Sequence, residues 1–295
     1  MSLVVNHNLM AANSSRYLNT HYKALSDSTR KLSSGLRVET AADDAAGLAI
    51  RELMRADIAA LTQGVRNAND GISLIQTADG ALGVIDEKLV RMKELAEQAA
   101  TGTYDSTQRL IIDSEYQQMA SEITRIANAT DFNGIKLLDG NLSSDTHDGT
   151  GLVSTGKLKI HFGTANDSAE DYYYIQIGDS TASALGVGNA NGGGAGHDIS
   201  TQANAQKALD AINNAIVSKD NIRAHLGALQ NRLENTITNL EVQSENLQSA
   251  ESQISDVDVA TEMTNFVRNQ ILTQSAVSML GQANSLPQMA LSLIG

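Results

Sequence analysis

Residues 226–257 read LGALQNRLENTITNLEVQSENLQSAESQISDV, and their spacing of apolar residues predicts the architecture of the chain. Mostly apolar residues recur through it at alternating intervals of three and four. The positions are Leu226, Leu229, Leu233, Thr236, Leu240, Gln243, Leu247, Ala250, Ile254 and Val257. This spacing places one stripe along a helix at a mean period of about 3.5 residues, as in a coiled coil. At about 1.5 Å of rise per residue the helix would be roughly 50 Å long, and it needs an equally long partner.

A matching stripe lies in the first half of the chain. Its members are Met54, Ile58, Leu61, Val65, Ala68, Ile72 and Ile75, and it resumes after Asp79 as Leu82, Ile85, Leu89, Met92, Ala96 and Ala99. The interruption at Asp79 predicts a stammer that overwinds the coiled coil locally. Two ordinary buried helices of a globular domain are the alternative, but globular helices usually run about 8–20 residues. We therefore predict a mainly α fold, in which both halves of the chain form a long antiparallel coiled-coil rod.

The composition limits the classes of protein that remain. Aromatic residues make up 3% of the 295 residues, which suits a narrow helical interface better than a globular core. Cysteine is absent, so disulfides, thiolate metal sites and cysteine nucleophiles are excluded. A net charge of −13 disfavours nucleic acid as a partner. No apolar run approaches the ~18 residues of a membrane span, and the first residues lack the features of a cleavable signal peptide.

The two ends of the chain are poor in charge and rich in apolar residues. Residues 1–40 carry a second stripe, formed by Leu18, Tyr22, Leu25, Thr29, Leu32 and Leu36. The C-terminal segment is apolar on two sides, with Met263, Phe266, Val267 and Ile271 on one and Leu272, Ala276, Met279, Leu280, Ala283 and Leu286 on the other. A helix that is apolar on more than one face needs more than one neighbour. We expect the N-terminal helix to be one neighbour and other copies of the molecule to be the rest, and we expect disordered ends in a lone monomer.

The remaining segments complete the predicted organisation. Thr40 followed by Asp43 and Asp44 indicates a helix start, whereas a metal or acid–base role for the paired carboxylates would need a His or Glu constellation nearby. A short helix should follow Asp105, whose partner in a capping box is Gln108. Strands are predicted at 157–162 and 172–177, joined as a hairpin with a long loop, and 189–196 is rich in glycine. The predicted domains are a terminal segment of 1–40 plus 261–295, a helical rod of 41–139 plus 200–260, and a β-hairpin and variable loop region of 140–199.

The usual signatures of catalysis are missing from the sequence. None of the six histidines lies in an H-E-x-x-H arrangement, and no phosphate-binding loop or G-x-S-x-G elbow occurs. The run at 192–196, GGGAG, lacks the lysine of a phosphate loop, so we interpret it as a linker. We predict no enzyme, no catalytic or metal site and no cofactor.

Several motifs, in order along both halves, make the chain resemble bacterial flagellin. They are LSSGLR at 32–37, DDAAG at 43–47, RNANDGIS at 66–73, FNG at 132–134, LGALQNRL at 226–233, ATE at 260–262, QAN at 282–284 and PQ at 287–288. The resemblance covers nearly the whole chain except roughly residues 140–200. It implies a secreted, extracellular subunit that polymerises into the flagellar filament for motility, with the ends forming an inner tube and the long helices a surrounding shell. It also implies type III export, an export chaperone, and contacts with flagellar cap and hook-junction proteins.

One segment resembles the flagellin surface that Toll-like receptor 5 recognises. The family pattern runs close to L-Q-R-x-R-E-L-A-x-Q, and residues 89–98 read LVRMKELAEQ. Arg91 and Leu95 match the contact residues of the family, Glu115 matches a third, and Val90 and Glu97 depart from the pattern. The alternative is that these residues hold the rod together and meet neighbouring subunits.

Three rival functions remain at this stage. A hook–filament junction protein would share the ends and the export route but occur in few copies. An enzyme carried on a flagellin scaffold would need a catalytic insertion, for which 140–200 is short. A soluble coiled-coil binding module predicts a discrete oligomer with ordered ends. The residues that we assign to self-assembly are Leu18, Tyr22, Leu25, Leu32, Leu36, Met263, Phe266, Ile271, Leu272, Met279, Leu280 and Leu286.

Overall fold

The structure is a computed structural model that describes residues 7–149, 155–167, 170–188 and 198–294, with the side chains of 286–288 and 290–294 left aside. The chain divides into two compact units. Unit 1 comprises Met1–Ile58 with Glu245–Gly295, and unit 2 comprises Ala59–Ser244. The predicted domain boundaries at 40/41 and 260/261 stay a prediction.

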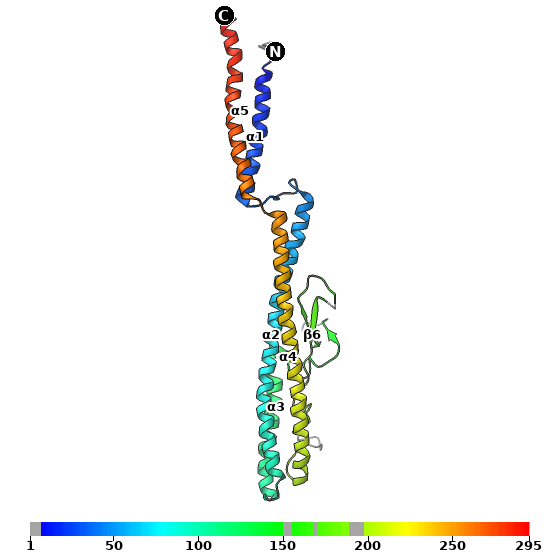
Figure 1. The fold of residues 1–295 in the computed structure, drawn as a ribbon. Coiled ribbons are helices and arrows are strands. Elements are labelled where there is room, and N and C mark those ends of the chain that lie inside the picture. The colour runs from blue at the N-terminus through cyan, green and yellow to red at the C-terminus, as the bar shows by residue number, and fades with distance from the viewer. Residues whose placement is uncertain (1–6, 150–154, 168–169, 189–197, 295) are drawn as a thin grey trace. The chain divides into compact units, whose positions relative to one another are not determined.

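Helices dominate the described part of the chain, which confirms the predicted fold class (Figure 1). The helices are α1 (Leu9–Ser34), α2 (Ala45–Ala100), α3 (Ser106–Ala129), α4 (Gln202–Ser255) and α5 (Val259–Ile294). The strands form three antiparallel pairs, β1 (Asp131–Phe132) with β2 (Ile135–Lys136), β3 (His147–Asp148) with β4 (Thr155–Gly156), and β5 (Leu158–His161) with β6 (Tyr172–Ile175). The last pair is the hairpin that the sequence predicts, in the register Leu158 to Ile175.

The core of unit 2 lies where α2, α3 and α4 pack side by side (Figure 1). Buried positions on α2 follow the three–four alternation without a break, at Leu61, Gly64, Ala68, Gly71, Ile75, Ala78, Leu82, Ile85, Leu89, Met92, Ala96 and Ala99. The predicted stammer after Asp79 is therefore wrong. Ala78 occupies the buried position, and the half-buried Asp79 carboxylate accepts a hydrogen bond from Arg223 Nε at 2.7 Å. A small residue escaped the sequence search because an alanine contributes little to an apolar stripe.

Ion pairs fix how α2 and α4 pair within unit 2. Lys219 is 2% exposed, and its ammonium group binds the carboxylates of Asp86 and Asp220. The Arg223–Asp79 pair lies one helical turn away on α4. Because a buried ammonium group is costly without its carboxylate, a shifted alignment of the two helices would be unfavourable.

Two glycines of α2 form the seat of the β5–β6 hairpin. A Cβ at Gly64 would overlap the carbonyl oxygen of Phe162, and one at Gly71 would overlap Ile160 Cδ1. Between them Asn67 Nδ2 donates a hydrogen bond of 2.8 Å to the His161 carbonyl oxygen. The hairpin backbone therefore approaches α2 more closely than any side chain at these glycines would allow.

The capping signal that the sequence predicts at Asp105 is confirmed. Asp105 accepts a hydrogen bond from Gln108 N, and Gln108 Oε1 accepts one from Asp105 N, which completes a capping box at the start of α3. Asn133 and Gly134 both have positive φ, 51° and 80°, as the tight turn between β1 and β2 requires. At the start of α2, Asp44 Oδ1 accepts hydrogen bonds from the amides of Ala46 and Gly47.

Candidate assembly surface

In unit 1, helices α1 and α5 pack against each other along a single stripe (Figure 1). The stripe on α1 runs through Leu18, His21, Leu25, Ser28 and Leu32, all half-buried except Ser28, which is 4% exposed. The matching stripe on α5 runs through Phe266, Asn269, Thr273, Ala276, Leu280 and Ala283. Because several of these residues are small or polar, the contact between the two helices leaves most of their large apolar side chains outside.

Large apolar side chains line the outer faces of both helices. They are Leu9, Met10, Tyr17 and Tyr22 on α1, and Val259, Met263, Val267, Ile271, Leu272, Val277, Met279 and Met289 on α5. The exposed fraction is 65% for Tyr22, 56% for Ile271 and 59% for Met279. An exposed apolar surface of this kind marks an interaction site. We call these twelve residues the outer apolar face.

The residues that the sequence assigns to self-assembly fall into two groups. Leu18, Leu25, Leu32, Phe266 and Leu280 are half-buried in the α1–α5 contact, and Leu36 is half-buried just after α1. Tyr22, Met263, Ile271, Leu272 and Met279 belong to the outer apolar face. The side chain of Leu286 lies outside the described residues. The sequence stripe assigned Tyr22 and Thr29 to the intrachain contact, where the structure instead has His21 and Ser28.

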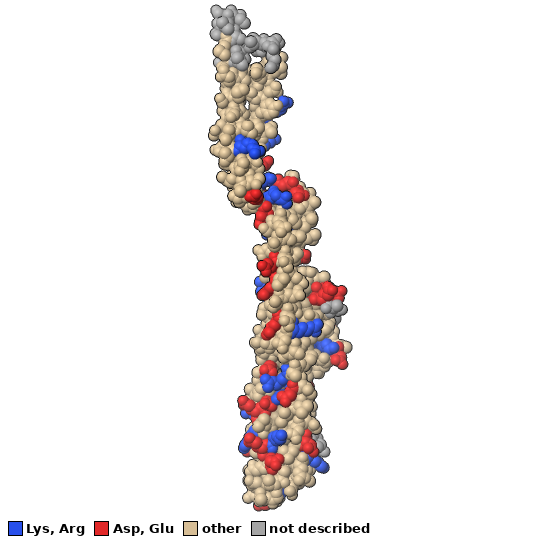
Figure 2. Space-filling view, viewed as in Figure 1, with Lys and Arg blue, Asp and Glu red and all other residues tan. Residues whose placement is uncertain are grey.

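Charge is sparse over this pair of helices. On the face shown in Figure 2, charged side chains are fewer over α1 and α5 than over α2 to α4. From Val259 onward, Glu262 and Arg268 are the charged residues. A surface with few charges loses little hydration when another protein covers it.

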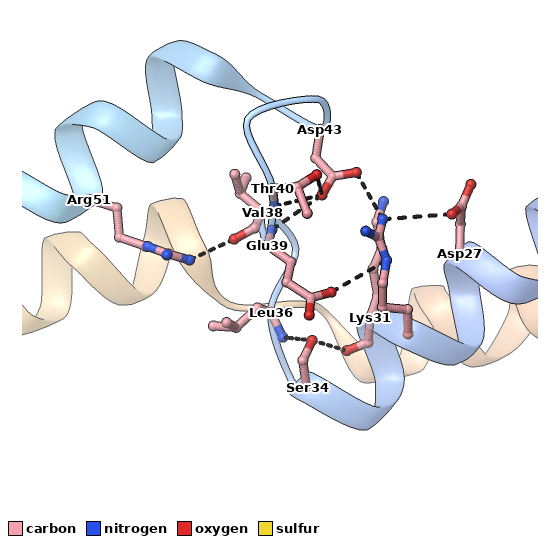
Figure 3. A network of polar contacts seen from close by, with 10 residues as sticks. Asp27, Lys31, Ser34, Leu36, Val38, Glu39, Thr40, Asp43 and Arg51 are labelled. Atoms are coloured by element: carbon pink, nitrogen blue, oxygen red, sulfur yellow. Dashed lines mark hydrogen bonds and ion pairs between the residues drawn. The ribbon is translucent and has the colours of Figure 1, made fainter.

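A network of polar contacts in unit 1 holds the loop between α1 and α2 (Figure 3). Arg30 on α1 donates from Nη2 to Asp43 Oδ1 at 3.0 Å, and its Nε lies 3.3 Å from Glu39 Oε2. Asp43 Oδ2 accepts hydrogen bonds from the Thr40 amide, the Thr40 hydroxyl and the Glu39 amide. These bonds, with the Thr40 amide contributing most and the Arg30 charge least, lower the pKa of Asp43 from 3.8 to about 2. The helix start predicted at Thr40 is therefore wrong, because α2 begins at Ala45 with Asp44 as the capping side chain, while Asp43 holds Thr40 in the preceding loop.

Two further arginines attach the same loop to its neighbours. Arg37 donates from Nη2 at 2.6 Å and from Nε at 3.1 Å to the Ile254 carbonyl oxygen near the end of α4. Arg51, which is 7% exposed, donates to the Val38 carbonyl oxygen at 2.7 Å (Figure 3). The short chain between α4 and α5 is held as well, because Val257 N donates to the Gly35 carbonyl oxygen at 3.0 Å. The connection from α1 to α2 and the connection from α4 to α5 are thus both held by hydrogen bonds to backbone carbonyl oxygens.

The candidate receptor patch lies in unit 2 on α2 and α3. Arg91 donates to Glu115 Oε1 from Nη2 at 2.7 Å and from Nε at 3.0 Å, and to Glu94 Oε2 at 2.9 Å. The hydrogen bonds to Glu115 and then to Glu94 raise the pKa of Arg91 above its ordinary value. Leu95 is 1% exposed, so it contributes to the core, while Arg91 and Glu115 offer the accessible surface.

Within the described ranges, no group of three or more His, Cys, Asp or Glu residues is placed to hold a metal ion. In the same part of the chain, no helix combines the length and apolar character that crossing a bilayer demands.

Comparison with known families decides what kind of protein carries this surface. Residues 5–143 match the bacterial flagellin N-terminal helical region, and residues 209–294 match the bacterial flagellin C-terminal helical region. The chain belongs to the bacterial flagellin family. Flagellins are structural proteins of the flagellar filament and not enzymes, which confirms the predicted class of protein.

Whole-length relatives agree with the family match. The chain is 43% identical to a flagellin of Halalkalibacterium halodurans over 292 residues, which cover 99% of this chain and 100% of the relative. It is 42% identical to a flagellin of Bacillus subtilis, with 98% and 99% of the two chains covered. Among solved structures, a flagellar hook-associated protein from Vibrio parahaemolyticus has the same fold at a TM-score of 0.54 and 14% identity, over 72% of this chain and all of that one.

Proposed function

We propose that this chain polymerises through the outer apolar face and the α1–α5 contact, and that the resulting filament serves motility outside the cell. The observation that carries the proposal is the exposure of large apolar side chains on both outer sides of the terminal pair. At about 25 cal/mol per Å² of apolar surface, even a few hundred Å² buried per neighbour contribute several kcal/mol before ordering costs. Repeated contacts with several copies would stabilise a fibre.

The terminal helices become ordered as the polymer forms. A single pair of helices buries one stripe and leaves the other sides in water, so most of the stabilising burial waits for neighbouring copies. Segments of this kind lose conformational entropy when they bind, and the loss is offset by the interface they create. Disordered ends in the monomer and helical ends in the filament are the expected states.

A truncation tests this proposal. The purified full-length chain and a variant that lacks residues 261–295 are each mixed with filament fragments as seeds. The full-length chain should elongate the seeds, and the truncated chain should not. A variant that lacks residues 189–196, in the predicted variable region, is the matched control and should elongate normally. Elongation by the chain without 261–295 would overturn the assembly role of α5.

The accessible Arg91–Glu115 pair supports Toll-like receptor 5 as a partner of the monomer. Exchanging both charges, as Arg91→Glu with Glu115→Arg, retains an ion pair between these two positions, gives up the exposed pair of Arg91 with Glu94, and inverts what a receptor would meet. The double variant should keep its thermal unfolding temperature and lose receptor activation. Unchanged activation would show that the receptor does not contact this pair.

A hook–filament junction protein remains the second candidate, and the hook-associated fold neighbour is what favours it. The relatives named flagellin that match the chain over its whole length favour the filament subunit instead. Abundance in sheared filaments separates the two, because a junction protein would be a trace component. Type III export, an export chaperone for the C-terminal segment, and contacts with cap and junction proteins belong to the same proposal.

A further inference from the structure

A row of aromatic rings lies on one face of the β5–β6 hairpin in unit 2. Tyr172 and Tyr174 are alternate residues of β6, so their side chains emerge on the same side of the strand. Their ring centroids are 5.4 Å apart, and the ring planes meet at 79°. His161 stacks on Tyr172 with 6.0 Å between the centroids, and His147 of β3 lies against Tyr174 at 5.5 Å. The row therefore runs from one histidine through the two tyrosines to the other histidine.

Tyr173, between these two tyrosines in the sequence, lies on the opposite face. Its ring packs edge-on against Phe162 at 4.7 Å, and the guanidinium of Arg232 covers it at 3.5 Å from the ring centroid. The alternation of the strand thus turns Tyr173 toward α4. It leaves Tyr172 and Tyr174 on the other side of the hairpin, where Tyr174 is 39% exposed.

Polar contacts hold the two phenol groups of the row together. Lys159 lies diagonally opposite Tyr172 in the hairpin, and its Nζ is 3.6 Å from the centroid of the Tyr172 ring. Desolvation raises the pKa of Tyr174 above its ordinary value, and a side-chain hydrogen bond with Tyr172 raises it further. The two phenols therefore meet at their hydroxyl groups as well as through their rings.

Two phenols in contact can undergo oxidative coupling. A one-electron oxidant removes one electron and one proton from each phenol, and each resulting phenoxyl radical shares its unpaired electron with the ring carbons next to the C–O carbon. The two radicals combine through a new carbon–carbon bond between such carbons, and the hydrogens on these carbons then move to the oxygens and restore both phenols. With hydrogen peroxide as the oxidant, one peroxide takes up the two lost hydrogens and yields two waters.

Proximity favours this pair over the other exposed tyrosines. Reacting groups that are already held in contact combine without a search through solution. Tyr17 and Tyr22 are 57% and 65% exposed, but five positions on α1 place them on different sides of that helix. In dilute monomers, a radical on Tyr172 or Tyr174 has a second phenol beside it.

We propose that Tyr172 and Tyr174 are an oxidative modification site, at which a peroxidase with hydrogen peroxide, or another one-electron oxidant, links the two rings as an intrachain dityrosine. Because the link joins two residues on one face of one strand, it leaves the pairing of β5 with β6 unchanged. The inference concerns the folded monomer and does not depend on polymerisation.

Removal of one phenol tests the proposal. Dilute monomers are treated with a heme peroxidase and hydrogen peroxide, and dityrosine in the monomer fraction is quantified by its fluorescence. Tyr172→Phe and Tyr174→Phe should each lower the yield by about fivefold or more, since neither keeps two phenols in contact. The matched control, Tyr173→Phe, removes the intervening phenol and should change the yield by less than about twofold, with the same circular dichroism in all variants. Equal yields from Tyr172→Phe and Tyr173→Phe would overturn the proposal.

Mass spectrometry identifies the linked residues directly. Trypsin leaves residues 160–207, with all three tyrosines of β6, in one peptide, because no Lys or Arg lies between Lys159 and Lys207. The coupled peptide should be lighter by two hydrogen atoms. It should also give no fragment ions from backbone cleavage on either side of Tyr173, because the link closes a ring around that residue. Fragments that separate Tyr173 from Tyr174 in the coupled peptide, or coupling between chains alone, would contradict the proposal.

Discussion

The body of unit 2 and the terminal pair of unit 1 use the same helical periodicity with opposite results. In unit 2, α2, α3 and α4 enclose large side chains completely, including Leu82, Ile85 and Tyr116 at 0% exposure. Among the described side chains of the α1–α5 pair, the buried ones are Ser28 and Ala283. A third packed helix, and not the apolar pattern itself, therefore determines whether a stripe is sealed within one chain.

The hydropathy of the helices also indicates that the terminal pair is not sealed within one chain. Between Val259 and Ile294, α5 is more apolar on average than the other helices, yet its large side chains remain exposed. A helix that is apolar on all sides is normally buried by neighbouring structure on all sides. This supports the proposal that the terminal pair is one part of a core that other copies complete.

The largest expected effect compares one core residue with one residue of the outer apolar face. Leu82→Ala should lower the free energy of unfolding of the monomer by about 2–5 kcal/mol, because it opens a cavity in a sealed core. Met279→Ala, at an exposed site, should change it by less than about 0.5 kcal/mol. Chemical denaturation of dilute monomers measures both. Equal losses would mean that a single chain already seals the outer apolar face.

The hairpin seat offers a smaller perturbation of the sealed unit. Gly64→Ala should destabilise unit 2 by about 1–3 kcal/mol, since the added Cβ meets the backbone carbonyl oxygen of Phe162. Gly80→Ala is the control on the same helix, where a Cβ meets nothing within 4 Å. It should leave stability unchanged or raise it by up to about 1 kcal/mol, because alanine favours helix over glycine. A neutral Gly64→Ala would show that the hairpin does not dock closely on α2.

The smallest expected effect concerns the loop between α1 and α2 in unit 1. The pKa of Asp43 is lowered from 3.8 to about 2, chiefly by the Thr40 amide. A carboxyl whose pKa is lower in the folded state stabilises that state above its unfolded pKa, and the contribution is lost as the pH falls from about 4 through about 2. NMR titration of the Glu39 and Thr40 amides should therefore show a transition near pH 2. Asp43→Asn should abolish it, and a transition near pH 4 in the natural chain would contradict the geometry of this loop.

Much of the fold follows from the sequence, because long helices repeat their signal many times. The paired stripes of α2 and α4, the capping box at Asp105 and the two strands of the hairpin all depend on local spacing or local hydrogen bonds. Errors arose where a small residue occupies a buried position. The predicted stripes placed Asp79 and Thr29 at buried positions, where the structure instead buries the neighbouring Ala78 and Ser28.

The surfaces were harder to predict than the helices. The apolar character of α5 indicated several neighbours, and the structure places Ile271 and Met279 on its open side. The sequence does not reveal which of two adjacent residues faces α1, because shifting the stripe by one position changes its apolar content very little. The hairpin seat depends on tertiary contacts between distant segments, so local patterns carry no signal for it.

The most direct measurement follows one side chain of the outer apolar face from monomer to filament. Ile271→Cys places a single thiol at a site that is 56% exposed in a chain with no other cysteine. Its maleimide labelling should be rapid in monomers and slowed on the order of 100-fold in filaments, because neighbouring copies would exclude solvent from the site. Labelling at the monomer rate in intact filaments would contradict the claim that other copies complete this core.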